Sequence, residues 1–324
     1  LSIDSNLAPS IEFNNVSFTF PHKPGEKEKP PLFQNLTFKI LPGQKVAFVS
    51  ESGAGKTTIF NLLYGYYTPS EGTIKINGLD ISKVSLQSLQ EHITLFGQTP
   101  NLFKGSIREN IRYGAKHPDK VTDSMIWELA RATNLYDFLN SFPSKLDTDV
   151  GESGKTLSGG QQQKVAVLRA LFKHSPIRLL DEITAPFDTK SATDVLNSIE
   201  QLSDGVTTLM ITHKLTEAQF LDQIFVLDKG KVIAQGTHQD LLKSCELYQR
   251  LWSAYTKHES PEQSRSPSIS TRDIMKTLGI TSTTKQEITT SIEIDENTAV
   301  FHDIIIEPSS IDSAVTSSFK IKMS

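Results

Sequence analysis

The chain has 324 residues, a formal net charge of −4, 37% hydrophobic residues and 22% charged residues. This is the composition of an ordinary soluble protein with one large domain or two smaller ones. The near balance of charge argues against nucleic acid as a partner, because binding to a phosphate backbone normally requires a strongly basic domain. The single cysteine, Cys245, can form no disulfide within the chain and leaves no cysteine cluster for zinc. Such cysteine usage is typical of a reducing compartment such as the cytosol.

Neither a membrane-spanning segment nor a signal peptide is predicted. No stretch approaches the run of about 18 apolar residues that can cross a bilayer, and the N-terminus lacks the basic and apolar regions of a leader. The chain as given is therefore predicted to be soluble. It begins with Leu1 rather than Met, and we expect that a further segment precedes it.

Residues 11 to about 255 alternate short β-branched runs with helical patterns. This alternation predicts an α/β domain with a largely parallel sheet. Residues 257–324 are instead rich in Ser and Thr, with no Trp or Tyr, and are predicted to be mostly disordered because they cannot bury enough apolar surface. Within them, residues 300–306 are either a short strand or docking peptide, or an apolar stretch of a disordered tail.

Strands and helices alternate around three motifs. In chain order we predict a buried strand at 45–50, a helix from near Lys56, a helix at 125–132 that begins near Thr122 or Asp123, a helix at 161–172, and buried strands at 177–180 and 207–212. Each of these strands ends in polar residues. In open α/β sheets, ligands bind at the carboxyl ends of the strands, so this edge is the expected site.

The first motif, Ser-Glu-Ser-Gly-Ala-Gly-Lys-Thr at 50–57, fits the phosphate-binding pattern G-x-x-x-x-G-K-[ST] except at its first position, where Ser50 replaces glycine. Gly53 and Gly55 let backbone N–H groups converge on phosphate oxygens, Lys56 can reach the β- and γ-phosphates, and Thr57 can bind magnesium. A positive φ at Ser50 would cost about 1–2 kcal/mol. In that case we expect weaker nucleotide binding.

The second motif, Leu-Leu-Asp-Glu at 179–182, ends a buried strand in two carboxylates. Asp181 is suited to hold magnesium through water, and Glu182 to polarise a water that attacks the γ-phosphate. Arg178 interrupts the apolar lead-in, so we expect one face of the start of this strand to be exposed.

The third motif, Leu-Ser-Gly-Gly-Gln at 157–161, precedes a predicted helix. Free backbone donors, the helix dipole and the Ser158 hydroxyl predict a second anion-binding site there. The alternative is a flexible hinge capped by serine.

Together the three motifs resemble the nucleotide-binding domain of ATP-binding cassette (ABC) transporters, over about residues 11–250. The resemblance implies an α/β fold of the P-loop NTPase class, the ABC cassette, at 11–256. This fold has a RecA-like core sheet, an antiparallel β subdomain and a helical signature subdomain at about 98–173. It also implies ATP and Mg²⁺ as cofactors. The phosphate loop would contribute Ser50, Glu51, Ser52, Gly53, Ala54, Gly55, Lys56, Thr57 and Thr58, while Thr57, Gln98 and Asp181 would hold the metal.

The resemblance assigns roles to further residues. Glu182, His213 and Gln98 would be catalytic, with Gln98 contacting magnesium and the attacking water, and His213 contacting the γ-phosphate and Glu182. Phe20 would stack on adenine; the alternative is a core aromatic at a strand end. Asp188 would contact a partner subunit, although Pro186 and Phe187 depart from the small residues common there.

Two segments indicate an exporter: residues 149–152 resemble the X-loop that contacts a transmembrane domain, and residues 101–111 resemble the segment after the exporter glutamine loop. Residues 1–10 would then be a linker from an upstream membrane domain. The implied partner is a second cassette in a head-to-tail dimer, in which Ser158, Gly159, Gly160 and Gln161 close over ATP held by the other subunit. ATP hydrolysis would power export from the cytoplasmic face of a membrane. Two alternatives stay open: a soluble ABC ATPase without a transport role, and a catalytically weak ABC regulator.

Overall fold

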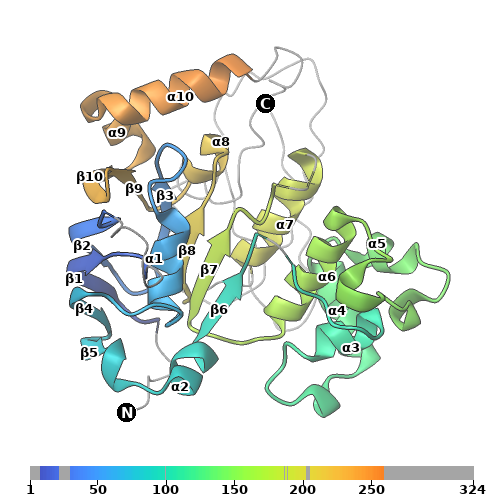
Figure 1. Ribbon diagram of the computed structural model, residues 1–324. Helices are drawn as coiled ribbons and strands as arrows, with labels where there is room; N and C mark the ends of the chain where they lie inside the picture. Colours follow the sequence, from blue (N-terminus) through green and yellow to red (C-terminus); the bar gives the residue numbers. More distant parts are fainter. Residues whose placement is uncertain are drawn as a thin grey trace, which may run out of the picture. The chain divides into compact units, whose positions relative to one another are not determined.

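The computed structural model describes residues 8–21, 30–98, 100–185, 187, 189–201 and 205–258 (Figure 1). All of them belong to one unit of the chain, Leu1–Gln263. Asp188, Pro186 and residues 259–324, with the segment 300–306, lie outside the described residues. What was expected of them stays a prediction.

A six-stranded sheet carries the three motifs. Its strand order is β10-β9-β3-β8-β7-β6, and all neighbouring strands are parallel except β9 and β10. The strands are β3 (Lys45–Val49), β6 (Ile93–Phe96), β7 (Ile177–Asp181), β8 (Thr207–Ile211), β9 (Gln223–Asp228) and β10 (Lys231–Gly236). The predicted α/β fold with a largely parallel sheet is confirmed, and the strands predicted at 45–50, 177–180 and 207–212 each agree with the structure to within one residue.

The central strands of this sheet are buried on both faces, as parallel strands usually are. In β3, Val46 and Phe48 pack into one apolar core, whereas Ala47 and Val49 pack into another. All five residues of β7 are buried. The continuous apolar runs in the sequence have this origin, because a strand covered on both faces has no polar side.

Arg178, in β7, is only 5% exposed, so the prediction of an exposed face at the start of this strand is wrong. Its guanidinium donates a hydrogen bond to the Ile199 carbonyl at 3.1 Å. Burial lowers the pKa of Arg178 to about 10. The long side chain can therefore be accommodated in the interior because its charged end has a backbone acceptor there.

A smaller antiparallel sheet has the order β2-β1-β4-β5. Its strands are β1 (Ile11–Phe18), β2 (Phe33–Ile40), β4 (Glu71–Ile76) and β5 (Leu79–Asp80). Phenylalanines join it to the central sheet: the Phe38 ring lies 4.4 Å from Phe13, 5.3 Å from Phe48 and 5.3 Å from Phe225. This sheet is the antiparallel β subdomain that the family resemblance implied.

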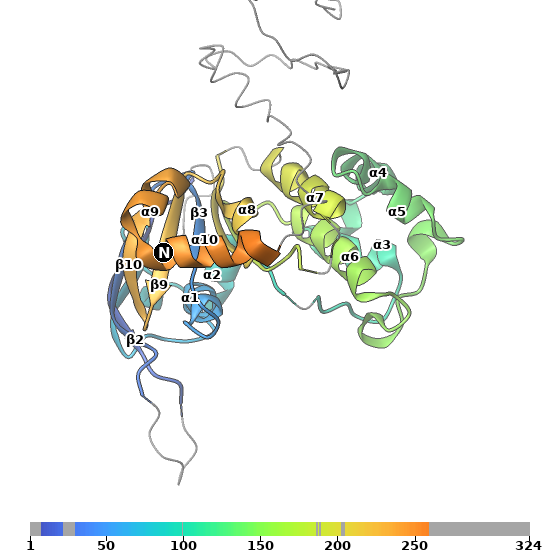
Figure 2. The ribbon, with the colours of Figure 1, turned by 90° about the horizontal axis from the view of Figure 1, so that it is seen from above.

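Two groups of helices lie beside the central sheet. Figures 1 and 2 show α3 to α6 gathered next to β6, and α9 and α10 near β9 and β10. The α-helices are α1 (Lys56–Leu63), α2 (Leu86–Glu91), α3 (Ile107–Arg112), α4 (Asp123–Ala132), α5 (Tyr136–Asn140), α6 (Gly159–Leu171), α7 (Thr189–Gln201), α8 (Leu215–Ala218), α9 (His238–Ser244) and α10 (Glu246–His258). Short 3₁₀ helices are η1 (Ile81–Lys83), η2 (Pro118–Lys120), η3 (Lys145–Asp147) and η4 (Glu152–Gly154).

Two predicted helix starts can be compared with the structure. The Thr122 hydroxyl accepts a hydrogen bond from the Met125 N–H, so α4 begins at Asp123 as predicted. Helix α6 begins at Gly159, two residues before the predicted start at Gln161. None of the helices in the described part of the chain combines the length and apolar character needed to span a bilayer.

Candidate nucleotide-binding site

Four neighbouring strands of the central sheet end in the residues predicted to carry the chemistry. The phosphate loop follows β3, Thr212 and His213 follow β8, Asp181 and Glu182 end and follow β7, and Gln98 lies just after β6. These strands are parallel and adjacent in the order β3-β8-β7-β6. Their carboxyl ends therefore meet at one edge of the sheet, as the sequence analysis predicted (Figure 1).

The phosphate loop joins β3 to the first residue of α1. Gly53 and Gly55 have φ values of 83° and 95°, a region that favours glycine. A Cβ at Gly55 would also lie 2.8 Å from the Phe33 ring, whereas a Cβ at Gly53 would meet nothing within 4 Å. Both glycines are thus required by their backbone conformation, and Gly55 also by its packing against β2.

Ser50 is not among the described residues with a positive φ. The expectation that serine strains this position, and so weakens nucleotide binding, loses its physical basis. The side chain is instead well accommodated, with only 6% of the residue exposed. Its hydroxyl donates to the Glu51 carbonyl at 2.7 Å.

Lys56 is a buried cation at the start of α1, also 6% exposed. Its ammonium donates to the Ser50 hydroxyl at 2.9 Å and to the Ser50 carbonyl at 3.4 Å. Burial lowers the pKa of Lys56, and the charges of Glu182 and Asp181 oppose that shift. A buried positive charge next to glycines and a helix N-terminus fits a group that binds phosphate.

Asp181 and Thr57 form a pair of oxygen ligands. Asp181 is 6% exposed, and burial raises the pKa of its carboxyl group, while a hydrogen bond with the Thr57 side chain acts in the opposite direction. A hydroxyl and a carboxylate in contact are suitable ligands for Mg²⁺. Among the described residues, no group of three or more His, Cys, Asp and Glu side chains is arranged to hold a metal ion. That Gln98 also holds the metal stays a prediction.

Glu182 brings the predicted catalytic residues together. Its Oε2 accepts a hydrogen bond from the Gln98 side-chain amide at 2.8 Å, and its Oε1 lies 2.9 Å from Nε2 of His213. The backbone N–H of Glu182 donates to the Ile211 carbonyl at 3.0 Å, which fixes it to the end of β8. The residue adopts a φ of 49°, in the left-handed region that non-glycine residues adopt uncommonly.

The signature motif lies at the surface, where Ser158 and Gly159 are exposed. The Ser158 hydroxyl accepts from the Gln161 N–H at 3.3 Å, and the Gln161 side chain accepts from the Ser158 N–H at 2.9 Å. This capping box makes both glycines the first residues of α6 rather than a loop before it. A Cβ at Gly159 would meet nothing within 4 Å, so the backbone of this turn is open to a partner molecule.

Phe20 is half-buried in an aromatic cluster after β1. Its ring meets those of Phe18 and Tyr67 edge-on, with centroids 5.1 Å and 5.7 Å away. These contacts are those of the alternative prediction, a core aromatic at a strand end. Stacking of Phe20 on adenine stays a prediction.

Sequence analysis missed the residues that hold the loops of His213 and Glu182. The Thr212 hydroxyl donates to the Glu217 carboxylate at 2.6 Å and accepts from the Lys214 N–H at 3.0 Å. The Lys214 ammonium reaches the Thr184 carbonyl at 3.3 Å, two residues after Glu182. The contact of Lys214 with Thr184 spans 30 residues of the chain, and no local pattern would have predicted it. The contacts of Thr212 with Lys214 and Glu217 are local, within six residues.

The two segments that resemble exporters pair with each other. Ser106 and Asp149 form an antiparallel bridge, and the Val150 N–H donates to the Gly105 carbonyl at 2.9 Å. The Asp149 carboxylate accepts from the Gly151 N–H at 2.8 Å. Residues 101–111, which include most of α3, and residues 149–152 are therefore joined through their backbones.

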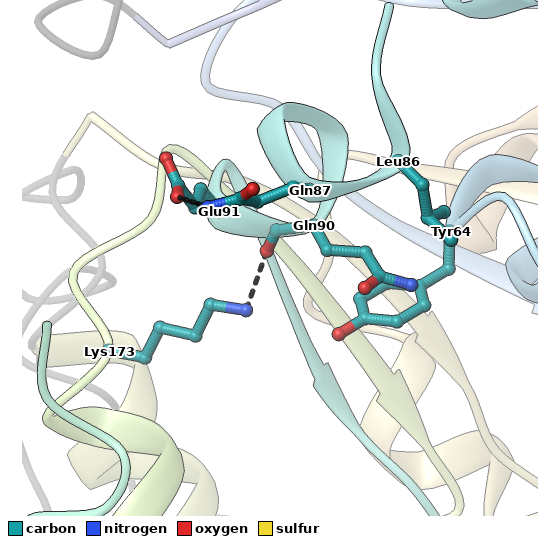
Figure 3. Close-up of a pocket in the computed structure, with 6 residues that line it drawn as sticks. All are labelled: Tyr64, Leu86, Gln87, Gln90, Glu91 and Lys173. Atoms are coloured by element: carbon teal, nitrogen blue, oxygen red, sulfur yellow. Dashed lines mark hydrogen bonds between the residues drawn. The ribbon is translucent and has the colours of Figure 1, made fainter.

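A cavity of about 450 Å³ lies elsewhere, and none of its lining residues belongs to the predicted site (Figure 3). The Lys173 ammonium crosses one side of it and donates to the Gln90 and Ile93 carbonyls at 2.6 Å and 2.8 Å. This lysine ties the end of α6 to α2 and β6. The cavity is lined by Tyr64, Leu86, Gln87, Gln90, Glu91 and Lys173.

A glycine-rich loop between a buried strand and a helix, at the carboxyl edge of a parallel sheet, defines the P-loop class of nucleotide-binding domains. Residues 33–185 match the sequence model of the ABC transporter family. The chain is 43% identical over 241 residues to ABC transporter B family member 17 of Arabidopsis thaliana. The aligned region covers 74% of this chain and 19% of that protein. It is 38% identical over 242 residues to the ATP-dependent lipid A-core flippase of Saccharophagus degradans. That aligned region covers 75% of this chain and 40% of the flippase.

A solved structure, a bacterial Atm1-family ABC exporter with ATP bound, superimposes with a TM-score of 0.72 at 36% identity, over 79% of this chain and 43% of that one. The matched region of this chain is a nucleotide-binding domain of the ABC transporter family, of the exporter type. It spans between about a fifth and two fifths of the length of these relatives.

Proposed function

We propose that this chain binds ATP with Mg²⁺ and hydrolyses it to drive an ABC exporter at the cytoplasmic face of a membrane. The observation that carries the proposal is the carboxylate of Glu182, which lies between Gln98 and His213 and acts electrostatically on Lys56 of the phosphate loop. A carboxylate held in this way at a phosphate-binding edge is suited to accept a proton from an attacking water.

Different side chains contribute to different parts of phosphoryl transfer. Lys56 and the backbone of residues 50–58 bind and orient the phosphates. Thr57, Gln98 and Asp181 would hold the metal, which would neutralise charge on the phosphate oxygens. Both oxygens of Glu182 are hydrogen-bonded in the structure. Each oxygen keeps a further lone pair, so an attacking water can donate to Glu182 while Gln98 and His213 hold the carboxylate in place.

The proposed partner is a second ABC cassette. The exposed turn at Ser158 and Gly159 offers backbone N–H groups and a helix N-terminus to an anion, and a head-to-tail dimer would bring it to the phosphates held by the other subunit. The paired segments 101–111 and 149–152 are the proposed contact with a transmembrane domain. Each subunit by itself lacks one part of the proposed ATP site, so hydrolysis requires dimerisation.

The test measures the magnesium-dependent ATPase rate per molecule as a function of protein concentration. We expect the rate to rise with concentration, because a composite site forms only in the dimer. In Glu182→Gln, an isosteric amide that cannot accept the proton, we expect a loss of at least about 100-fold with ATP still bound. A rate independent of concentration would contradict the composite site, and a rate of zero with ATP bound would favour a catalytically weak regulator.

A further inference from the structure

The position where this chain departs from the phosphate-binding pattern contacts the key lysine. Glycine at this position could offer Lys56 only its carbonyl oxygen, which in this structure lies 3.4 Å from the ammonium. Ser50 adds a hydroxyl oxygen at 2.9 Å, the shorter of the two contacts. Among the described residues, both hydrogen bonds of the Lys56 ammonium go to Ser50.

The hydroxyl is oriented for this contact. It donates its own proton to the Glu51 carbonyl at 2.7 Å, so its lone pairs are directed at the lysine. A hydroxyl that donates to one group and accepts from another is polarised, which strengthens both bonds. Ser50 and Lys56 are each 6% exposed, and a charge-assisted hydrogen bond is strong where water does not compete.

We propose that the Ser50 hydroxyl is a positioning group for Lys56, which holds the ammonium at the base of the loop and leaves its remaining N–H free for a nucleotide phosphate. The inference rests on the proposed nucleotide binding. It reverses the expectation from the motif: restoring glycine at position 50 weakens binding. Fixing the side chain beforehand reduces the entropy that Lys56 loses when it engages a phosphate.

Ser50→Ala isolates the hydroxyl. Since φ at Ser50 is not positive, alanine can adopt the same backbone conformation without strain. We expect Ser50→Ala and Ser50→Gly to bind ADP, in the absence of magnesium, about three- to tenfold more weakly than the parent chain by calorimetry. Equal or tighter binding by Ser50→Ala would overturn the proposal.

A double-mutant cycle tests the contact without any nucleotide. Ser50→Ala should lower the melting temperature of the 324-residue chain more when Lys56 is present than in a Lys56→Met background, where only the hydrogen bond to the Glu51 carbonyl is lost. The matched control is Ser52→Ala, an exposed serine of the same loop, which should show no coupling to Lys56. Absence of coupling between Ser50 and Lys56 would overturn the positioning role. Failure of the parent chain to bind ADP would instead reject the proposed function, while this cycle still reports on the contact.

Discussion

Burial affects the two charged residues of the site in opposite ways. The pKa of Lys56 is lowered and that of Asp181 is raised, in both cases chiefly by loss of water around the charge. Each shift means that the ionised form is unfavourable in the folded protein. The residues that suit phosphate and magnesium therefore reduce the stability of the fold, which is a common cost of a functional site.

Asp181→Asn should stabilise the folded chain at neutral pH. Burial raises the carboxyl pKa above its ordinary value of 3.8, so the contribution of this group to stability is present below that value and is lost as the pH rises through the folded pKa. The side-chain amide of asparagine carries no charge, so the variant avoids this loss of stability. We expect a higher melting temperature for Asp181→Asn at pH 7, a gain that shrinks as the pH falls toward about 4, and loss of magnesium-dependent ATPase activity.

Thermal unfolding at several pH values makes this measurement, with Asp119→Asn as the control. Asp119 is an exposed aspartate in η2, and its neutralisation should leave the profile unchanged. A lower melting temperature for Asp181→Asn at pH 7 would mean that its contacts with Thr57 and Lys56 outweigh its burial.

Two helices begin with the same arrangement of residues. Ser106 caps α3 with Glu109 as its partner, and Ser158 caps α6 with Gln161. In both, the serine hydroxyl accepts a backbone N–H and the longer side chain returns the hydrogen bond. This likeness allows the local role of Ser158 to be separated from its proposed role toward a second subunit.

Ser106→Ala and Ser158→Ala should each cost about 1 kcal/mol of the free energy of unfolding, since each removes one helix cap. Denaturant unfolding measures this loss. The ATPase rate should fall at least about tenfold in Ser158→Ala only, because only that hydroxyl is expected to reach a bound nucleotide. An equal fall in both variants would mean that helix stability, not nucleotide contact, limits the rate.

At the scale of the whole molecule, the proposed dimer can be tested by mixing two inactive variants. Lys56→Ala damages a subunit's own phosphate loop, and Ser158→Arg blocks the signature turn that it would offer to its partner. In a mixed dimer, the intact phosphate loop of one chain would face the intact turn of the other. Half of the dimers in an equal mixture are mixed and carry one working site of two, so we expect about a quarter of the parent rate.

ATPase assays of each variant alone and of the equal mixture make this measurement. Each variant alone should be inactive at every concentration. A mixture that stays inactive, although both variants fold and associate, would contradict a head-to-tail arrangement with shared sites.

The sequence by itself determined the local elements and the motifs. Three local features are predictable because each depends on only a few residues. Glycine conformations define the loop at 50–57, a continuous apolar strand leads to the carboxylates of Asp181 and Glu182, and capping chemistry places the start of α6. The meeting of Gln98, Glu182 and His213 follows from one further rule, that parallel strands end at the same edge of a sheet.

The tertiary structure alone decided the contacts between distant segments. It set the strand order, buried Arg178 with its guanidinium on the Ile199 carbonyl of α7, and joined Lys214 to Thr184. It also decided that Ser50 takes an unstrained backbone and holds the Lys56 ammonium. These outcomes depend on which segments pack together and how much water they exclude, and that balance of burial against hydrogen bonding is a property of the assembled fold.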